Sequence, residues 1–241
     1  MIRFLVGVLV FVIDTLYRDR PYQRFYVLET VARVPYFSFL SVLHLYETLG
    51  WWRKADWLKV HFAESWNEMH HLLIMESLGG NKHWSDRFLA QTTALFYYWV
   101  VVALYIVSPR TAYNFMEMVE EHAHHTYDTF LREHEAELKA KPAPQVAINY
   151  YRDGDLYLFD EFQTGVVPES RRPAVDNLYD VFVNIRDDEG EHVKTMMACQ
   201  KPDAQKTFKS PHSLPYSEQK VILPLVTEAE VERELADPMF K

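Results

Sequence analysis

Residues Trp51–Leu78, WWRKADWLKVHFAESWNEMHHLLIMESL, contain neither glycine nor proline and are followed at once by Gly79 and Gly80. Such a stretch predicts one long helix that ends at the glycine pair. Polar and aromatic side chains recur within it at intervals of three or four, at Trp57, His61, Glu64, Glu68 and His71. That spacing places them on one face. The predicted helix therefore carries acids and histidines on a single side.

The rest of the chain also favours helices. About half of its 241 residues are hydrophobic, 15% are aromatic and only seven are glycine, which is typical of one packed all-α domain. Further helices are predicted over Arg24–Glu47, with at most a local interruption at Pro35, over Trp84–Ser108, over Pro109–Ala140 and over Ala174–Gln200. One domain is predicted over residues 1–200, with a long connection at 142–173. Residues 201–241 are predicted to form a tail with a short helix around Thr227–Ala236.

Net charge and cysteine content exclude one class of partner and one class of site. The formal net charge is −9, which argues against a nucleic-acid partner, because phosphate binding needs clustered Lys and Arg. The single cysteine, Cys199, cannot form an intramolecular disulfide or a thiolate cluster. Any metal site must therefore use oxygen and nitrogen ligands.

Acids and histidines follow an ordered pattern across four predicted helices. A carboxylate-bridged di-iron site takes one carboxylate from each of two helices and a Glu-x-x-His pair from each of two others. Four carboxylates neutralise the charge of two ferrous ions, and each imidazole binds one of the two irons. In chain order the pattern is met by Glu29, then Glu68 and His71, then Glu120 or Glu121, then Glu189 and His192. The sequence predicts a ferritin-like four-helix bundle with a di-iron centre.

The pattern alone leaves alternatives at single positions. Glu29 lies in an apolar run, VLETVA, where an uncompensated carboxylate is unfavourable, and its alternative role is an interhelical salt bridge. A third Glu-x-x-His match, Glu121 with His124, competes for the third helix. The segment around Glu189 is rich in charge and taken alone is typical of a solvated helix face.

Two apolar segments indicate attachment to a membrane. Met1–Ile13 and Leu95–Val107 (LFYYWVVVALYIV) are both shorter than the roughly 20 residues that span a bilayer. Helices over 1–17 and 84–108 are therefore predicted to lie in one leaflet, held by aromatic and arginine anchors. No cleavage site follows the first segment, so it is predicted to be retained. The alternative for the second segment is a buried core helix.

Four short motifs together resemble the alternative oxidase family, and more closely its plastid terminal oxidase branch. They are LET (28–30), NEMHH (67–71), VEEHA (119–123) and RDDEGEH (186–192), and the similarity extends over about residues 20–200. The resemblance implies that the iron ligands are Glu29, Glu68, His71, Glu120, Glu189 and His192. It implies Glu120 rather than Glu121 because the family's ligand is the first glutamate of that motif.

The resemblance also implies roles for residues around the irons. Tyr127 matches a tyrosine that takes part in oxygen reduction. Asn67 and Asp188 match residues that orient metal ligands. The residues that match the quinol pocket of related enzymes are Arg24, Leu28, Ala123 and Thr126.

A member of this branch is expected to oxidise two quinols and to reduce O2 to two waters at two iron ions, without proton pumping. The expected partners are a membrane quinol, with plastoquinol favoured and ubiquinol open, the thylakoid membrane surface, and a second copy of the chain. No transit peptide is recognised, which suits a mature plastid protein or a cyanobacterial one. Two other activities remain as alternatives, a ferritin-like ferroxidase and a di-iron hydroxylase of a quinone precursor, beside a metal-free helical protein attached to the membrane.

Overall fold

The computed structural model describes residues 15–51, 55–154, 156–163, 173–201 and 227–236, together with positions 7 and 13. The helices are α2 (Pro21–Ala32), α3 (Val34–Thr48), α4 (Ala55–Ser77), α5 (Trp84–Val107), α6 (Pro109–Lys139), α7 (Gln145–Tyr151), α8 (Leu156–Phe162), α9 (Leu178–Gln200) and α11 (Glu228–Leu235). Apart from one isolated β-bridge between Pro142 and Asn177, the described residues contain no strand. The predicted all-α class is confirmed.

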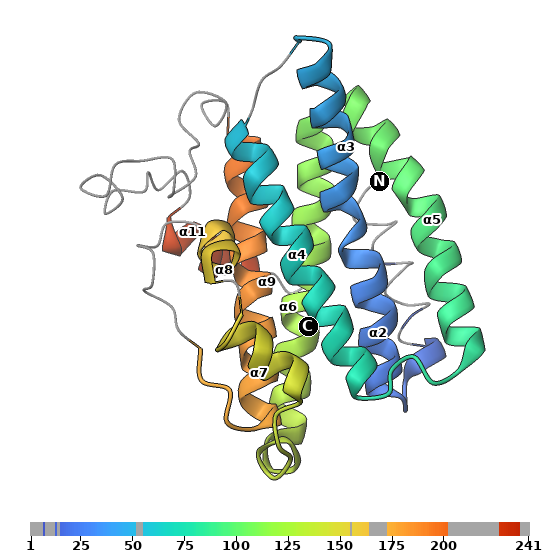
Figure 1. The fold of residues 1–241 in the computed structure, drawn as a ribbon, viewed down its shortest axis with the longest axis vertical. Helices are drawn as coiled ribbons and strands as arrows, with labels where there is room; N and C mark the ends of the chain where they lie inside the picture. Colours follow the sequence, from blue (N-terminus) through green and yellow to red (C-terminus); the bar gives the residue numbers. More distant parts are fainter. Residues whose placement is uncertain are drawn as a thin grey trace.

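Four long helical segments form the bundle: α2 continued by α3, then α4, α6 and α9 (Figure 1). α6 and α9 share the most extensive contact, and α4 packs against both α2 and α3. α5 packs on the outer side of α2 and α3, while α7 and α8 lie against α4. This arrangement agrees with the predicted four-helix bundle and its additional apolar helix.

The first bundle segment is interrupted at Arg33, between α2 and α3. Pro35 occupies the first turn of α3, where a proline is tolerated because the first amides of a helix have no partner within it. The missing amide of Pro35 cannot bond back to the preceding turn, so the hydrogen-bond ladder ends just before it. The predicted local interruption is therefore confirmed, two residues earlier than the proline itself.

Capping side chains fix where two bundle helices begin. The Ser108 hydroxyl accepts a hydrogen bond from the Thr111 amide ahead of α6, and the Asn177 side chain accepts one from the Asp180 amide ahead of α9. Each cap satisfies an amide that has no partner within its helix. The helices that carry the third and fourth parts of the acid–histidine pattern thus begin at defined residues.

The connection predicted over residues 142–173 contains two helices that sequence analysis did not predict, α7 and α8. Four aromatic side chains from them are buried: Tyr150, Tyr151, Phe159 and Phe162. Burial of these rings stabilises helices that are too short to show a reliable period in sequence. The segment predicted only as a connection is therefore partly helical within the residues that the structure describes.

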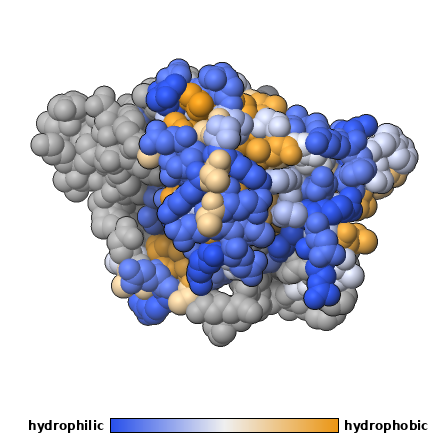
Figure 2. All heavy atoms as spheres, turned by 90° about the horizontal axis from the view of Figure 1, so that it is seen from below, coloured by the Kyte–Doolittle hydropathy of each residue, from blue (hydrophilic) through white to orange (hydrophobic). Residues whose placement is uncertain are grey.

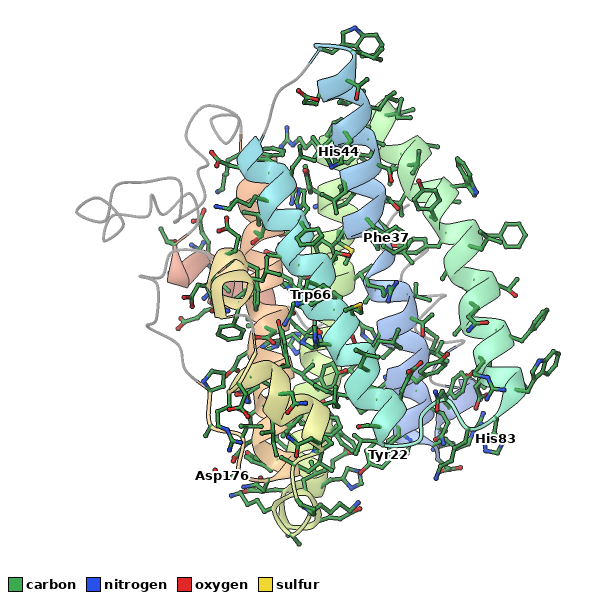
Figure 3. The ribbon with its side chains drawn as sticks, in the orientation of Figure 1. Tyr22, Phe37, His44, Trp66, His83 and Asp176 are labelled. Atoms are coloured by element: carbon green, nitrogen blue, oxygen red, sulfur yellow. The ribbon has the colours of Figure 1, made fainter. Side chains whose placement is uncertain are left out.

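Helix α5 places an apolar surface on the flank of the bundle. Its large exposed side chains are Trp84, Phe88, Leu89, Leu95, Phe96, Trp99, Val100, Ile106 and Val107. In Figure 3 side chains of α5 project away from the bundle. Only 17% of its most apolar window is buried, which contradicts the alternative of a buried core helix. Among the described helices, α5 is also the one long and apolar enough to cross a membrane, by length and composition only.

The lower end of the bundle differs from this flank. Figure 2 views that end, and most of its described surface is hydrophilic. Helix α5, which carries the exposed apolar side chains, runs along the side of the bundle (Figure 1). The other predicted membrane helix, at residues 1–17, falls mostly outside the described residues. Of the predicted tail, the short helix is confirmed as α11, which begins at a capping box between Thr227 and Glu230.

Two clusters of buried side chains fill the bundle. One contains Phe25, Tyr127 and Phe182, and the other contains Tyr36 and Tyr113. Tyr127 and Tyr36 each reach a different carboxylate of the polar site described next. The apolar core thus holds the site from both sides and excludes water from it.

Candidate metal centre

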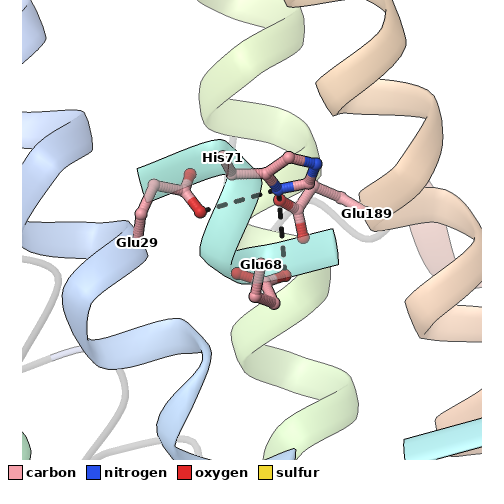
Figure 4. Close-up of side chains that lie close together, drawn as sticks. All are labelled: Glu29, Glu68, His71 and Glu189. Atoms are coloured by element: carbon pink, nitrogen blue, oxygen red, sulfur yellow. Dashed lines mark ion pairs between the residues drawn. The ribbon is translucent and has the colours of Figure 1, made fainter. Parts of the chain in front are cut away.

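The six residues predicted as iron ligands converge inside the bundle and are almost completely buried. Their ligand atoms form two groups, each with all atoms within 4.8 Å of one another: Glu29, Glu68, His71 and Glu189 in the first, and Glu68, Glu120, Glu189 and His192 in the second. Figure 4 shows the first group, which draws on α2, α4 and α9. Glu68 and Glu189 belong to both groups. The two groups could hold two neighbouring cations, with Glu68 and Glu189 shared between them.

In the first group, His71 Nδ1 faces three carboxylates (Figure 4). It lies 3.3 Å from Glu189 Oε1, 3.7 Å from Glu29 Oε2 and 4.0 Å from Glu68 Oε1. Metal–ligand bonds of about 2 Å place the atoms around one ion about 3 Å apart. The separations in this group are close to that spacing.

In the second group, His192 Nδ1 takes the equivalent place. It lies 3.0 Å from Glu68 Oε1, 3.5 Å from Glu189 Oε2 and 3.9 Å from Glu120 Oε1. Each imidazole therefore directs Nδ1 at one terminal carboxylate and at both shared ones. This is the outcome expected of two Glu-x-x-His pairs on facing helices.

Donor atoms of the site lack hydrogen bonds. Both side-chain oxygens of Glu68 and Glu189, one of Glu29, one of Glu120 and Nδ1 of both histidines make none. A buried polar atom without a partner costs about 1–3 kcal/mol. A cation in each group would remove that cost, and four carboxylates match the charge of two ferrous ions. The donor set fits two iron ions better than it fits a set of side chains alone.

The pKa values of the shared and terminal carboxylates also indicate that a positive charge is needed. Burial raises the pKa of Glu68 well above its ordinary value, and the nearby charge of Glu189 raises it further. Burial and Glu189 act in the same way on the pKa of Glu120. Cations between these groups would let all of them ionise together.

Asp188 fixes the orientation of His71. Its Oδ2 atom accepts hydrogen bonds from Asn67 Nδ2 at 2.9 Å and from the Tyr151 hydroxyl at 2.8 Å, and it lies 3.1 Å from His71 Nε2. A carboxylate only accepts, so Nε2 carries the proton and Nδ1 is left for a metal. The predicted roles of Asn67 and Asp188 fit this arrangement. Tyr151, which lies in the predicted connection, belongs to no motif and was not anticipated.

Each terminal carboxylate receives a hydrogen bond from a tyrosine. The Tyr127 hydroxyl donates to Glu29 Oε1, and the Tyr127 ring stacks on Phe25. The Tyr36 hydroxyl donates to Glu120 Oε1 at 2.5 Å. Burial, and then the charge of its partner glutamate, raises the pKa of each tyrosine well above its usual value. Tyr127 was predicted from the resemblance, but Tyr36 belongs to no motif and was missed.

Glu120 joins the site and Glu121 does not. Glu120 lies in the second ligand group, whereas Glu121 forms a separate group of carboxylates with Glu117 and with Glu234 of α11. His124, the partner of Glu121 in the competing match, packs near Gly190 on α9. The helix therefore turns the first glutamate of the motif toward the bundle interior, as the resemblance implied.

An apolar pocket of about 120 Å³ reaches one ligand of the centre. Of the four residues predicted for the quinol pocket, Leu28 and Ala123 line it, together with Glu29 and His122. Arg24 and Thr126 do not line it. Both lie beside His122: the Thr126 hydroxyl is 3.4 Å from His122 Nε2. Burial, followed by the positive charge of Arg24, lowers the pKa of His122 to about 4.

Comparison with known proteins agrees with the geometry. A family model described as "Alternative oxidase" matches residues 1–201. The chain is 66% identical over 211 residues to "Ubiquinol oxidase 4, chloroplastic/chromoplastic" of Arabidopsis thaliana, a match that covers 88% of this chain and 59% of the relative.

Mitochondrial relatives are less similar. The chain is 31% identical to "Ubiquinol oxidase 2, mitochondrial" of Glycine max and 30% identical to "Ubiquinol oxidase 1a, mitochondrial" of Oryza sativa subsp. japonica, each over 180 residues. These matches cover 74% of this chain and 48% of each relative. The chain thus spans about half to three fifths of the length of the relatives it matches. The identity to the plastid relative, about twice that to the mitochondrial ones, supports the resemblance to the plastid branch. The chain belongs to the alternative oxidase family.

Proposed function

We propose that this chain is a quinol:oxygen oxidoreductase, which oxidises two quinols and reduces O2 to two waters at a non-haem di-iron site without pumping protons. The proposed ligands are the six residues of the two groups: Glu29, Glu68, His71, Glu120, Glu189 and His192. The observation that carries the proposal is that Glu68 and Glu189 are shared between two buried groups, while a pocket reaches the terminal ligand Glu29.

The chain's own residues have distinct parts in this reaction. Bound irons would supply the redox centre at which O2 is reduced. Asp188 keeps the proton of His71 on Nε2, so that Nδ1 stays available. Tyr127 keeps its proton because its pKa is raised, and through Glu29 it is placed to give a hydrogen bond or a hydrogen atom to the oxygen site. The two buried aromatic clusters keep bulk water away.

The pocket beside Glu29 suits a quinol ring. Its walls are mostly apolar, and two of its residues are exposed: Leu89 of α5, and Leu16. A quinol that arrives from the membrane would therefore enter from the apolar surface. His122 is neutral near pH 7, since its pKa is about 4, and so can accept a hydrogen bond from a quinol hydroxyl. Thr126 contacts His122, and the positive charge of Arg24 helps to lower the pKa of His122.

The exposed apolar flank supports attachment to one leaflet of a membrane. A monotopic position along α5 would bring the pocket mouth to the depth at which quinols diffuse. The proposed location is the thylakoid membrane and the proposed quinol is plastoquinol, because the more similar of the relatives described above is named as chloroplastic/chromoplastic. On α4, Phe62 and Leu73 are exposed, and the proposed contact with a second copy of the chain is at this helix.

Oxygen uptake by the detergent-solubilised protein tests the proposed activity. We expect two irons per chain, uptake driven by a plastoquinol analogue more than by a ubiquinol analogue, and no inhibition by cyanide. A ring-hydroxylated product would instead identify a hydroxylase. Solubility without detergent, with assembly into a shell that stores ferric iron, would identify a ferroxidase. An iron content well below two per chain after anaerobic reconstitution would contradict the proposed di-iron site.

Vesicle flotation tests the membrane surface separately. The double variant Phe96→Ser/Trp99→Ser changes two exposed side chains of α5 and should weaken binding to vesicles made of neutral galactolipid. The matched control is Trp51→Ser, which removes an exposed tryptophan outside α5. Equal binding by the double variant and the wild type would exclude α5 as the attachment surface.

A further inference from the structure

A row of aromatic side chains leads away from Glu120, on the side of the metal centre opposite to Tyr127. We call it the tyrosine chain; its members are Tyr36 of α3, His61 of α4, Tyr113 of α6 and Tyr105 of α5. All four are buried. None of them lines the pocket beside Glu29, and the proposed reaction uses none of them.

The middle of the tyrosine chain is a hydrogen-bonded triad. His61 Nδ1 lies 2.7 Å from Glu64 Oε2, and His61 Nε2 lies 2.9 Å from the Tyr113 hydroxyl. A carboxylate at Glu64 can only accept, so Nδ1 carries the proton and Nε2 accepts from Tyr113. The Tyr105 hydroxyl, 2.8 Å from that of Tyr113, then donates to it. Tyr113 is thus held with a base at its proton, which is the arrangement that a phenol needs to give up an electron and a proton together.

The contact between Tyr36 and the triad suits electrons rather than protons. The rings of Tyr36 and His61 are 6.4 Å apart between centroids, and among the described side chains no hydrogen bond joins the two. A proton needs a continuous hydrogen-bonded route, whereas an electron can tunnel between packed rings. Each tyrosine nevertheless has its own proton acceptor, Glu120 for Tyr36 and His61 for Tyr113.

The tyrosine chain points toward the surface of the protein. Trp57 packs against both His61 and Tyr113, with centroid distances of 6.4 and 5.6 Å. Tyr46 packs against the buried cluster that contains Tyr105 and Tyr113. The ring of Tyr46 is 6.0 Å from that of Trp51, which is 72% exposed. A series of oxidisable rings therefore extends from Glu120 of the metal centre to Trp51 at the surface.

We propose that the tyrosine chain is an escape route for oxidising equivalents, which it carries from the metal centre to the surface when quinol runs short. The proposal rests on the proposed function, because one quinol supplies only two of the four electrons that O2 needs. The centre is then left with an oxygen-derived oxidant and no donor. Without an escape route that oxidant would attack the ligands and the residues around them.

Each electron transfer along the tyrosine chain is accompanied by a proton transfer to a neighbouring acceptor. Tyr36 gives an electron to the oxidised centre and its proton to Glu120, which leaves a neutral tyrosyl radical. Tyr113 reduces that radical, Tyr36 recovers its proton from Glu120, and the Tyr113 proton moves to His61 Nε2. Tyr105 then reduces the Tyr113 radical and passes its own proton to the Tyr113 oxygen, to which it is hydrogen-bonded. Trp51 reduces the Tyr105 radical by way of Tyr46 and releases its N–H proton to solvent, while Tyr105 recovers a proton from Tyr113 and Tyr113 recovers one from His61. A soluble thiol or enediol reductant gives a hydrogen atom to the Trp51 radical at the surface and is itself oxidised by one electron.

Mapping of oxidised side chains tests this route, with a readout other than turnover. Iron-loaded protein is given O2 with one quinol analogue per O2, or hydrogen peroxide alone, and is frozen for electron paramagnetic resonance or digested for mass spectrometry. We expect a tyrosyl radical signal and oxidised Trp51 in the wild type. In Tyr113→Phe, which keeps the ring, oxidation of Trp51 should fall severalfold and oxidation near Tyr36 should rise. Iron-free protein gives the background from direct attack.

The controls separate the route from a structural role. Tyr22→Phe removes a tyrosine that bonds Lys141 outside the tyrosine chain and should leave the oxidation pattern unchanged. Tyr105→Phe provides a second variant within the chain if Tyr113→Phe does not fold. Unchanged oxidation of Trp51 in a folded Tyr113→Phe or Tyr105→Phe protein would overturn the proposal. If no quinol drives oxygen uptake but peroxide still oxidises Trp51 through Tyr113, the proposed function is wrong. The tyrosine chain would then still be a route for oxidising equivalents.

Discussion

The Tyr36 hydroxyl donates a hydrogen bond of 2.5 Å to Oε1 of Glu120, a terminal carboxylate of the second ligand group. Tyr127 makes the corresponding bond to Glu29 of the first group. The two tyrosines come from helices on different sides of the bundle and from different core clusters. Each therefore leaves the other oxygen of its glutamate, which has no hydrogen bond, free to bind a cation.

Replacing Tyr36 by phenylalanine should weaken one iron position and spare the other. The variant loses the hydrogen bond that orients Glu120 but keeps the buried ring. Loss of such an orienting partner typically lowers metal affinity by about 10–100-fold. Metal titration should therefore show one tight and one weakened iron. Equal weakening of both, or of neither, would contradict the assignment of Tyr36 to the second position.

Replacing Tyr127 by phenylalanine should lower oxygen uptake far more than iron content. After loading with excess iron, the iron content of this variant and of Tyr36→Phe should stay near that of the wild type, because each glutamate keeps Oε2 for the metal. Most of the oxygen uptake should be lost only in Tyr127→Phe, because the reacting site loses its hydroxyl. Iron analysis and oxygen uptake on the same sample separate the two effects. Normal uptake would remove Tyr127 from the mechanism.

The neighbouring glutamates Glu120 and Glu121 provide a matched pair of variants. Glu120→Ala removes a donor from the second ligand group and should abolish oxygen uptake. Glu121→Ala changes a carboxylate that faces Glu117 and Glu234 instead, and should keep much of the activity. Oxygen uptake and iron content measured for both variants check the pair. The reverse order of effects would require the ligand assignment to be changed.

The convergence of these six residues could be anticipated from sequence because its constraints are local and ordered. Glu68 and His71 are one helical turn apart, as are Glu189 and His192, and that spacing alone places each pair on one face. Glu29 is a single acid in an apolar run, which burial beside cations explains. The choice of Glu120 over Glu121 needed the resemblance, because either glutamate satisfies the spacing.

Residues that act through long-range contacts could not be anticipated. Tyr36 meets Glu120 across 84 positions of sequence, and Tyr151 meets Asp188 across 37. Neither tyrosine stands in a motif, and each reads as an ordinary core aromatic. The helices α7 and α8 were missed for a related reason: packing against α4 stabilises them, and their own sequence is too short to predict it.

Tyr151→Phe should test the importance of the contact with Asp188. The variant leaves Asn67 and His71 as donors to Asp188 Oδ2, so the folded protein should persist with a less rigid His71. We expect metal affinity at the first position to fall by about 10-fold, with a smaller change in stability. Tyr179→Phe changes a half-buried tyrosine of α9 that packs beside Lys139 rather than Asp188, and serves as the control. Equal metal affinity in both variants would show that Tyr151 does not position the histidine.

The pH dependence of stability should report the burial of His124. Burial, and then the positive charge of His125, lowers the pKa of His124 to about 4 from an ordinary value of 6.5. The unfolded chain therefore takes up this proton at a higher pH than the folded one, so stability is complete above pH 6.5 and falls as pH drops toward 4. The loss from this one group approaches about 3 kcal/mol, from the difference between pKa values of about 4 and 6.5.

Urea unfolding of wild type and His124→Asn above pH 6.5 and near pH 4 should show a smaller loss of stability in the variant. His83→Asn, at an exposed position, should follow the wild type, and identical pH profiles for all three proteins would rule out a buried neutral His124.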